Sequence, residues 1–237
     1  MSYNPSRSTW INPNIEYVFN DEIVEYDMQD AGLSIIKNYK LLDSNTIKEL
    51  DALPKEERHR SIGKLQINIK DLSSRLSEKF SEMRGLFISE NNISSNNIIS
   101  VKKDAIYTLG SYNKLKFGKV KFVPKNQYSS YIRFTDNMNI EIYYNDGVVD
   151  VKGISDSRLN RHRLYMLHFI SKVINGLENK NPSIKRFIKT FINDYKSMNV
   201  DDGYYLEFNN KSIDINPVYN FTKVIIPLVK IIQKEIK

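Results

Sequence analysis

Asp27 is the residue of this sequence whose type and position best suit metal chemistry. It follows an apolar segment, residues 23–26, that reads as a short strand, and a turn containing Gly32 comes directly after it. The strand fixes the backbone of such an aspartate while the turn exposes its oxygens, which are the ligands that hard divalent cations prefer. The alternative is that Asp27 or Asp30 only caps the helix that begins near Leu33.

Basic residues that suit phosphate binding are concentrated in two parts of the chain. Residues 101–125 contain seven lysines and one acid, Asp104, and residues 158–196 contain nine Lys or Arg against two acids. Residues 15–60 are instead acidic, with eleven Asp or Glu against six Lys or Arg. A basic surface beside an acidic pocket suits a protein that holds a polyanion around metal ions. AT-rich codon usage, which enriches Lys, is the alternative explanation.

Composition excludes several classes of site. The 237-residue chain has a formal net charge of +7 and no cysteine, which removes disulfides and thiolate metal sites. Its three histidines are too scattered for a histidine cluster. It contains neither eighteen consecutive apolar residues nor a signal-peptide pattern, so we expect no membrane partner and a cytoplasmic location.

Hydrophobic periodicity predicts an α+β fold in a single domain over residues 1–237. Residues 1–22 are expected to form an irregular N-terminal arm, and residues 155–237 a mainly helical C-terminal portion. Between them the pattern predicts helices over 33–39, 45–53 and 62–87, then strands over 98–109, 116–123, 128–134, 140–144 and 148–151. Asn145–Asp146–Gly147 predicts a hairpin turn. The expected architecture is an antiparallel sheet packed with helices.

Two segments resemble motifs of family B DNA polymerases. Residues 27–36, DMQDAGLSII, are similar to motif A, D-F-x-S-L-Y-P-S-I-I, with Asp27 at its first position. Residues 101–107, VKKDAIY, are similar to motif C, Y-G-D-T-D-S-I-Y, with Asp104 at its second aspartate and Lys102 at its first. A third segment, residues 151–154 followed by Arg158 and Arg161, looks like the K-G-x segment and basic helix start beyond the polymerase palm.

The resemblance implies a palm-like sheet and metal-dependent nucleotidyl transfer. Asp27 and Asp104 would be the catalytic residues and would hold Mg²⁺ or Mn²⁺. Nucleic acid, DNA rather than RNA, would be held by basic residues: Lys102, Lys103, Lys152, Arg158, Arg161 and Arg163. A phage or mobile element is the implied source. Gly32 falls where the family has a tyrosine that crowds the ribose 2′-hydroxyl, which predicts poor discrimination against ribonucleotides, whereas an ordinary turn glycine is the alternative.

The sequence also departs from the polymerase pattern. Lys102 replaces one motif C aspartate, and the fingers motif K-x-x-x-N-S-x-Y-G is reduced to Lys64 and Asn68. These departures favour an alternative, a palm-like phage module that binds or assembles without catalysis. The polymerase interpretation leaves room for a partner protein that supplies the missing fingers.

A second enzyme reading is a PD-(D/E)-x-K nuclease. Asp150 and Lys152 form D-x-K on an apolar strand, with Asp136 or Glu141 as the partner acid. In that chemistry the acids hold a metal ion and Lys152 polarises the attacking water.

Overall fold

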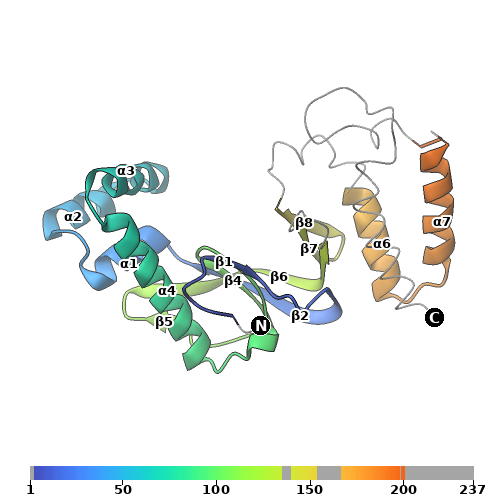
Figure 1. Ribbon diagram of the computed structural model, residues 1–237, viewed down its shortest axis with the longest axis horizontal. Helices are drawn as coiled ribbons and strands as arrows, with labels where there is room; N and C mark the ends of the chain where they lie inside the picture. Colours follow the sequence, from blue (N-terminus) through green and yellow to red (C-terminus); the bar gives the residue numbers. More distant parts are fainter. Residues whose placement is uncertain (1–2, 135–139, 154–166, 198, 201–237) are drawn as a thin grey trace. The chain divides into compact units, whose positions relative to one another are not determined.

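The computed structural model describes residues 3–134, 140–153, 167–197 and 199–200 (Figure 1). Its helices and antiparallel strands form the predicted α+β fold. The chain divides into two compact units: the first comprises Met1–Ile15 and Glu22–Gln127, and the second Glu16–Asp21 and Tyr128–Lys237. The single domain expected over residues 1–237 stays a prediction. None of the described helices is long and apolar enough to cross a membrane.

The first unit is built on a sheet with strand order β1-β3-β4-β2-β6, and β5 pairs with β6. Strands β2 and β6 also contribute their remaining residues to the second unit. The strands are β1 Thr9–Ile11, β2 Tyr17–Met28, β3 Ile98–Lys102, β4 Ala105–Leu109, β5 Lys116–Phe117 and β6 Val120–Phe134. The pairs β1–β3, β3–β4, β2–β4 and β5–β6 are antiparallel.

Four α-helices lie between β2 and β3 in the chain. They are α1 Ala31–Tyr39, α2 Ser44–Ala52, α3 Lys55–Asn68 and α4 Leu72–Glu90, and a short 3₁₀ helix, η1 Ser95–Asn97, precedes β3. Asp43 caps α2, because its carboxylate accepts hydrogen bonds from the backbone N–H groups of Asn45 and Thr46. Pro54 precedes the first turn of α3, whose acids Glu56 and Glu57 suit the positive end of the helix dipole.

The core of the first unit lies between the sheet and these helices. Alternate residues of β2, namely Val24, Tyr26 and Met28, are buried in it. Their partners come from α1, α4 and neighbouring strands, and they include Ile35, Ile36, Leu76, Phe87, Val101, Ile106 and Phe122. Glu25 and Asp27 alternate with the buried residues of β2 and therefore belong to the opposite side of that strand. The packing of β2 thus decides where its carboxylates lie.

The second unit contains a hairpin and two helices. These are β7 Ile140–Asn145, β8 Val148–Lys152, α6 His168–Glu178 and α7 Ser183–Lys196, and β7 pairs antiparallel with β6 and β8. The predicted turn is confirmed: Asp146 and Gly147 both have positive φ, 44° and 83°, as a type I′ hairpin requires. A second apolar cluster, including Ile132, Ile142, Phe169, Val173 and Ile188, joins the hairpin to the helices.

The N-terminal arm is the first correction to the sequence prediction. Residues 1–22 are not irregular throughout, because Thr9–Ile11 pairs with β3 and β2 begins at Tyr17. A three-residue strand has too few alternating positions to be read from sequence. Of the C-terminal portion, residues 155–237, the described residues include α6 and α7, while residues 155–166 and 201–237 lie outside the described part.

Two predicted elements are each divided by a turn. The helix expected over 62–87 breaks between α3 and α4, where Asp71 has φ 63°, and α3 begins earlier, at Lys55. The strand expected over 116–123 turns at Gly118, φ 60°, into the β5–β6 hairpin. A side chain at Gly118 would place its Cβ 2.3 Å from Oδ1 of Asn38, so only glycine fits this turn.

Gly176 of α6 should tolerate no larger residue, because a Cβ there would lie 2.7 Å from Cδ1 of Ile184 on α7. Gly176→Ala is expected to lower the free energy of unfolding by about 1–3 kcal/mol through overpacking. Gly63→Ala is the matched control: its Cβ would meet nothing within 4 Å, so alanine should stabilise α3 by up to about 1 kcal/mol. Urea denaturation measures both, and equal effects at the two glycines would contradict the packing argument.

Candidate functional site

A cavity of about 630 Å³ in the first unit contains both aspartates that the sequence selects, Asp27 and Asp104. Its walls come from the end of β2, the start of α1, one face each of α3 and α4, and the turn between β3 and β4. The polar and glycine residues that line it are Ser8, Asp27, Asp30, Gly32, Lys55, His59, Gln66, Ser73, Ser77, Arg84, Lys103 and Asp104.

The pairing of β2 with β4 brings the two aspartates into this cavity. Asp27 lies opposite Ala105, the residue after Asp104, and the Met28 N–H donates to the Asp104 carbonyl oxygen at 3.2 Å. Asp104 sits in the two-residue turn between β3 and β4. The antiparallel sheet therefore joins a strand end and a hairpin turn that are far apart in the sequence.

Asp27 and Asp104 interact electrostatically. Burial raises the pKa of Asp27, and the charge of Asp104 raises it further, whereas Lys125 acts in the opposite direction. The Lys125 ammonium lies 3.6 Å from Oδ2 of Asp27 and 3.6 Å from Oε1 of Glu25. Glu25 is itself buried and accepts a hydrogen bond from Asn126 at 2.6 Å. A cation close to Asp27 thus stabilises its ionised form.

Asp27 and Asp104 are the acids of the cavity that could serve as ligands of a metal ion. In the described part of the chain, no group of three or more His, Cys, Asp or Glu could hold a metal ion. Asp27 and Asp104 would therefore supply one or two carboxylates. Mg²⁺ is commonly bound in this way, because it keeps several waters and takes its remaining ligands from substrate phosphates.

Arg84 holds the turn that carries Asp104. Its guanidinium is almost fully buried and donates to the Lys103 carbonyl oxygen at 2.8 Å, the Pro5 carbonyl oxygen at 2.8 Å and the Tyr3 hydroxyl at 3.0 Å. The Lys103 N–H also donates to the Ser8 carbonyl oxygen at 2.6 Å. Lys103 has φ 56°, which is uncommon outside glycine, so these contacts fix a backbone conformation that local preferences disfavour.

Helix α3 presents a polar face to the cavity. Lys55, His59 and Gln66 are four and seven residues apart, so they lie along one side of the helix. Gly32 at the start of α1 also lines the cavity. A Cβ at Gly32 would lie 3.3 Å from Cδ1 of Ile62, so the small residue lets α3 approach α1 closely. Gly32 therefore has a packing role whatever the cavity binds.

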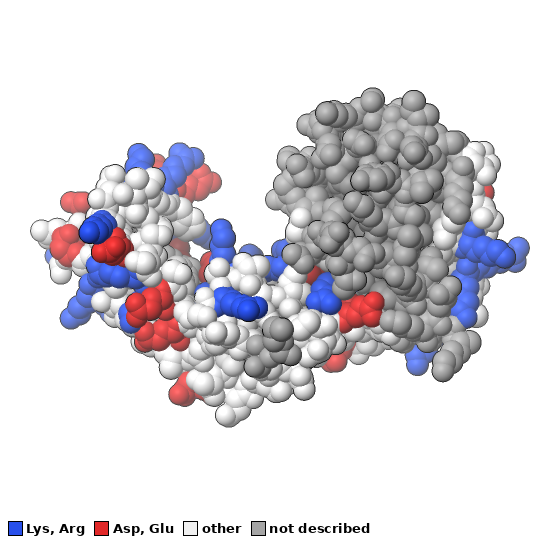
Figure 2. Space-filling view, viewed as in Figure 1, with Lys and Arg blue, Asp and Glu red and all other residues white. Residues whose placement is uncertain are grey.

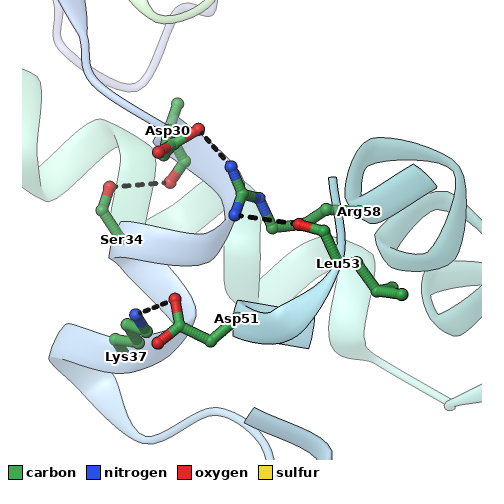
Figure 3. A network of polar contacts seen from close by, with 7 residues as sticks. Asp30, Ser34, Lys37, Asp51, Leu53 and Arg58 are labelled. Atoms are coloured by element: carbon green, nitrogen blue, oxygen red, sulfur yellow. Dashed lines mark hydrogen bonds and ion pairs between the residues drawn. The ribbon is translucent and has the colours of Figure 1, made fainter. Parts of the chain in front are cut away.

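Asp30 stands at the rim of this cavity and is neutralised by α3. Figure 3 shows its carboxylate directed at Arg58, whose Nη2 lies 2.8 Å from Oδ1, and the same guanidinium reaches the Leu53 carbonyl oxygen at 3.5 Å. Asp30 does not cap α1 with its side chain and has φ 47°. The alternative that Asp30 caps the helix therefore holds for its N-cap position but not for its side chain, because the carboxylate pairs with Arg58 instead.

The predicted phosphate-binding residues fall into three groups. Lys103 lines the cavity. Lys102 does not, but it lies in one cross-strand row with Ala105 and Asp27, two strands away from the latter. Lys152 belongs to the second unit, and its ammonium lies 2.8 Å from Oδ2 of Asp150. Arg158, Arg161 and Arg163 lie outside the described residues.

The residues of the nuclease reading are brought together in part. Lys152 lies opposite Glu141 in the β7–β8 pairing, and Tyr128 donates to Oδ2 of Asp150 at 2.7 Å. Glu141 is fully buried and accepts hydrogen bonds from the hydroxyls of Tyr131 and Tyr143. Asp136, the other acid considered, lies outside the described residues.

Sequence reasoning missed several residues of the cavity. Lys55 and His59 precede the helix expected over 62–87. The spacing of residues 55, 59 and 66 nevertheless places all three on one face of a helix that begins earlier. Arg84 and Lys125 carry no local signal, because their partners are distant in sequence.

On the face shown in Figure 2, acidic and basic side chains are interspersed over α2 and α3.

The sequence was compared with protein-family models and with curated proteins. The model of the family described as bacteriophage PBS1 gene 130 protein matches residues 3–235. No curated protein matches the sequence.

Replacing Asp27 by its neutral analogue should stabilise the protein at neutral pH. Because its pKa is raised, the folded state binds the Asp27 proton more tightly than the unfolded chain does, so stability falls as the pH rises through that pKa. Asp27→Asn is therefore expected to raise the unfolding temperature at pH 7. The difference should disappear below pH 3.8, the ordinary pKa of the group, where both states are protonated.

Asp51→Asn is the matched control for this measurement. A hydrogen bond from Lys37 lowers the pKa of Asp51, so the neutral variant should be the less stable one at pH 7. Thermal unfolding monitored by circular dichroism between pH 3 and pH 7 compares the two. A drop in stability for both variants at pH 7 would contradict the assignment of Asp27 as a destabilised carboxylate.

Proposed function

The chain belongs to the family of the bacteriophage PBS1 gene 130 protein, and we propose that this phage protein binds nucleic acid and catalyses metal-dependent nucleotidyl transfer in its first unit. The observation that carries the proposal is the meeting of Asp27, at the end of β2, and Asp104, in the β3–β4 turn, in one cavity. These are the two positions at which the sequence resembles motifs A and C of family B DNA polymerases. The proposed substrate is DNA rather than RNA, and the proposed setting is the host cytoplasm.

The cavity suits a nucleotide with its metal ion. Asp27 and Asp104 are proposed to hold Mg²⁺ or Mn²⁺, which would bridge phosphate oxygens and neutralise the charge that develops in the transfer. Lys55 on α3 and Lys103 in the β3–β4 turn would supply positive charge to the phosphates, and the first residues of α1 add the positive end of a helix dipole. Arg84 acts as a positioning residue, because it holds the carbonyl oxygen of Lys103 next to Asp104.

A second candidate function is nucleic-acid binding or assembly without catalysis. Two lysines favour it: Lys102 replaces one motif C aspartate, and Lys125 lies 3.6 Å from Asp27, where its charge competes with a metal ion. A partner chain that supplies the missing fingers belongs instead to the catalytic proposal. The two candidates differ in catalysis: the enzyme would transfer nucleotides and would need Asp27 and Asp104 to do so, whereas the binding protein would transfer none.

Primer extension with Mg²⁺ or Mn²⁺ tests the catalytic proposal. Asp27→Asn and Asp104→Asn should each reduce extension at least a hundredfold, since each removes a proposed metal ligand. Glu49→Gln, which removes an exposed carboxylate that does not line the cavity, should leave extension unchanged. No extension by the wild type, together with salt-dependent DNA binding, would favour the non-catalytic candidate.

The same preparation tests the nuclease reading through Asp150→Asn. Metal-dependent cleavage of DNA that is lost in Asp150→Asn and retained in Asp27→Asn would assign the chemistry to the second unit. Cleavage or extension that depends only on Asp27 and Asp104 would exclude that reading.

Sugar selection is a separate prediction from Gly32. In the proposed register Gly32 lines the cavity where a bulkier residue would crowd the ribose 2′-hydroxyl. Extension with ribonucleotides is therefore expected to proceed within about tenfold of extension with deoxyribonucleotides, because Gly32 has no side chain to make even the small apolar contact that would discriminate by roughly 10–200-fold. Single-nucleotide incorporation kinetics with the two substrates measure the ratio. Strong rejection of ribonucleotides would show that the motif A register is wrong.

A further inference from the structure

The β5–β6 hairpin carries three lysines on its outer side. Its apolar residues Phe117, Val120 and Phe122 are buried in the core of the first unit, which leaves Lys116, Lys119 and Lys121 exposed. None of these three lysines forms an ion pair with a described residue. Lysines near them in the chain differ, since Lys114 pairs with Glu90, and Lys125 with Glu25 and Asp27.

The three charges also repel one another. Lys116 lies directly opposite Lys121 in the β5–β6 pairing, and like charges in that position destabilise a hairpin. Lys119 occupies the turn between them. The hairpin therefore maintains a concentrated positive charge that a bound anion would relieve.

Lys119 and Lys121 line a cleft of about 190 Å³ beside the start of α1. The other polar side chains of this cleft are Gln29, Asp30, Ser34, Lys37 and Asp51. Both acids already have cationic partners: Asp30 pairs with Arg58 at 2.8 Å and Asp51 with Lys37 at 2.5 Å, as Figure 3 shows. The net charge of the cleft is consequently set by Lys119 and Lys121.

The cleft is fixed in position by backbone contacts. The Asn38 side chain on α1 accepts the Lys119 N–H at 2.8 Å, and the Gln29 N–H donates to the Lys121 carbonyl oxygen at 2.8 Å. Gly118 makes the first of these contacts feasible, because any side chain there would collide with Asn38. The two lysines are thus anchored to the segment that follows Asp27.

Asp30 lines both the cleft and the cavity that contains Asp27 and Asp104. We propose that the cleft, with Lys116, Lys119 and Lys121, binds backbone phosphates of a nucleic-acid strand that extends past Asp30 into the cavity. This inference rests on the proposed function only in taking nucleic acid as the ligand of the cavity. Lysines bind phosphates as point charges, so the contact would follow the backbone without reading sequence.

The test is the salt dependence of oligonucleotide binding, measured by fluorescence anisotropy with a labelled single-stranded DNA. A triple variant, Lys116→Gln, Lys119→Gln and Lys121→Gln, should bind on the order of tenfold more weakly at low salt. Its slope of log K against log salt should be smaller by about 2, because each lost phosphate contact on a single strand removes about 0.7. The triple Lys→Arg variant should keep both values.

The control variant carries Lys40→Gln, Lys48→Gln and Lys70→Gln. These lysines are exposed in the first unit, line neither the cleft nor the cavity, and have no ion pair with a described residue. It loses the same total charge, so it corrects for non-specific attraction, and its binding should stay close to that of the wild type. Thermal unfolding of both triple variants checks that they are folded.

Equal binding by the two triple glutamine variants would overturn the inference. Unchanged binding by the triple Lys→Gln variant of the hairpin, together with a greater tendency to aggregate, would also overturn it. The lysines would then serve to protect the exposed edge strand β5 from pairing with other molecules. Binding of inorganic phosphate to the cleft without any binding of the oligonucleotide would show a simple anion site. That result would also overturn the inference. Primer extension is measured separately, so the loss of Asp27-dependent extension and the loss of hairpin-dependent binding are distinguishable.

Discussion

The register between β2 and β4 is the constraint on which the first unit depends. Val24, Tyr26 and Met28 are buried against the helices, and this packing fixes which side of β2 carries its carboxylates. A shift of one residue would move Asp27 into the apolar core and turn the buried side chains outward. The hydrophobic pattern of one strand therefore places Asp27 next to the turn that contains Asp104.

This placement has an energetic cost that suits a binding site. Burial and the charge of Asp104 disfavour ionisation of Asp27, and Lys125 offsets only part of that effect. Groups whose pKa is displaced in this way are concentrated at functional sites, where a ligand relieves the unfavourable charge. A divalent cation at Asp27 and Asp104 would do so, and Arg84 keeps the backbone of the second aspartate in place.

The segment from Asp27 to α1 lines both the cavity and the cleft. The cavity and the cleft share Asp30, whose pairing with Arg58 joins the start of α1 to α3. Asn38, at the other end of α1, holds the β5–β6 turn. The short helix α1 thus contacts the parts of the chain that carry the two carboxylates, the polar face of α3 and the basic hairpin. In this way charges that are far apart in the sequence form one local site.

The sequence by itself determined the features that depend on near neighbours. The strand over residues 23–26 and the Asp146–Gly147 turn were both predictable, because each follows from residues a few positions apart. The meeting of Asp27 with Asp104 was predicted only through a family resemblance. The tertiary structure alone decided the break before α4, the turn at Gly118 and the partners of Arg84 and Lys125. These depend on packing and ion pairs between segments far apart in the chain, and no local pattern encodes such contacts.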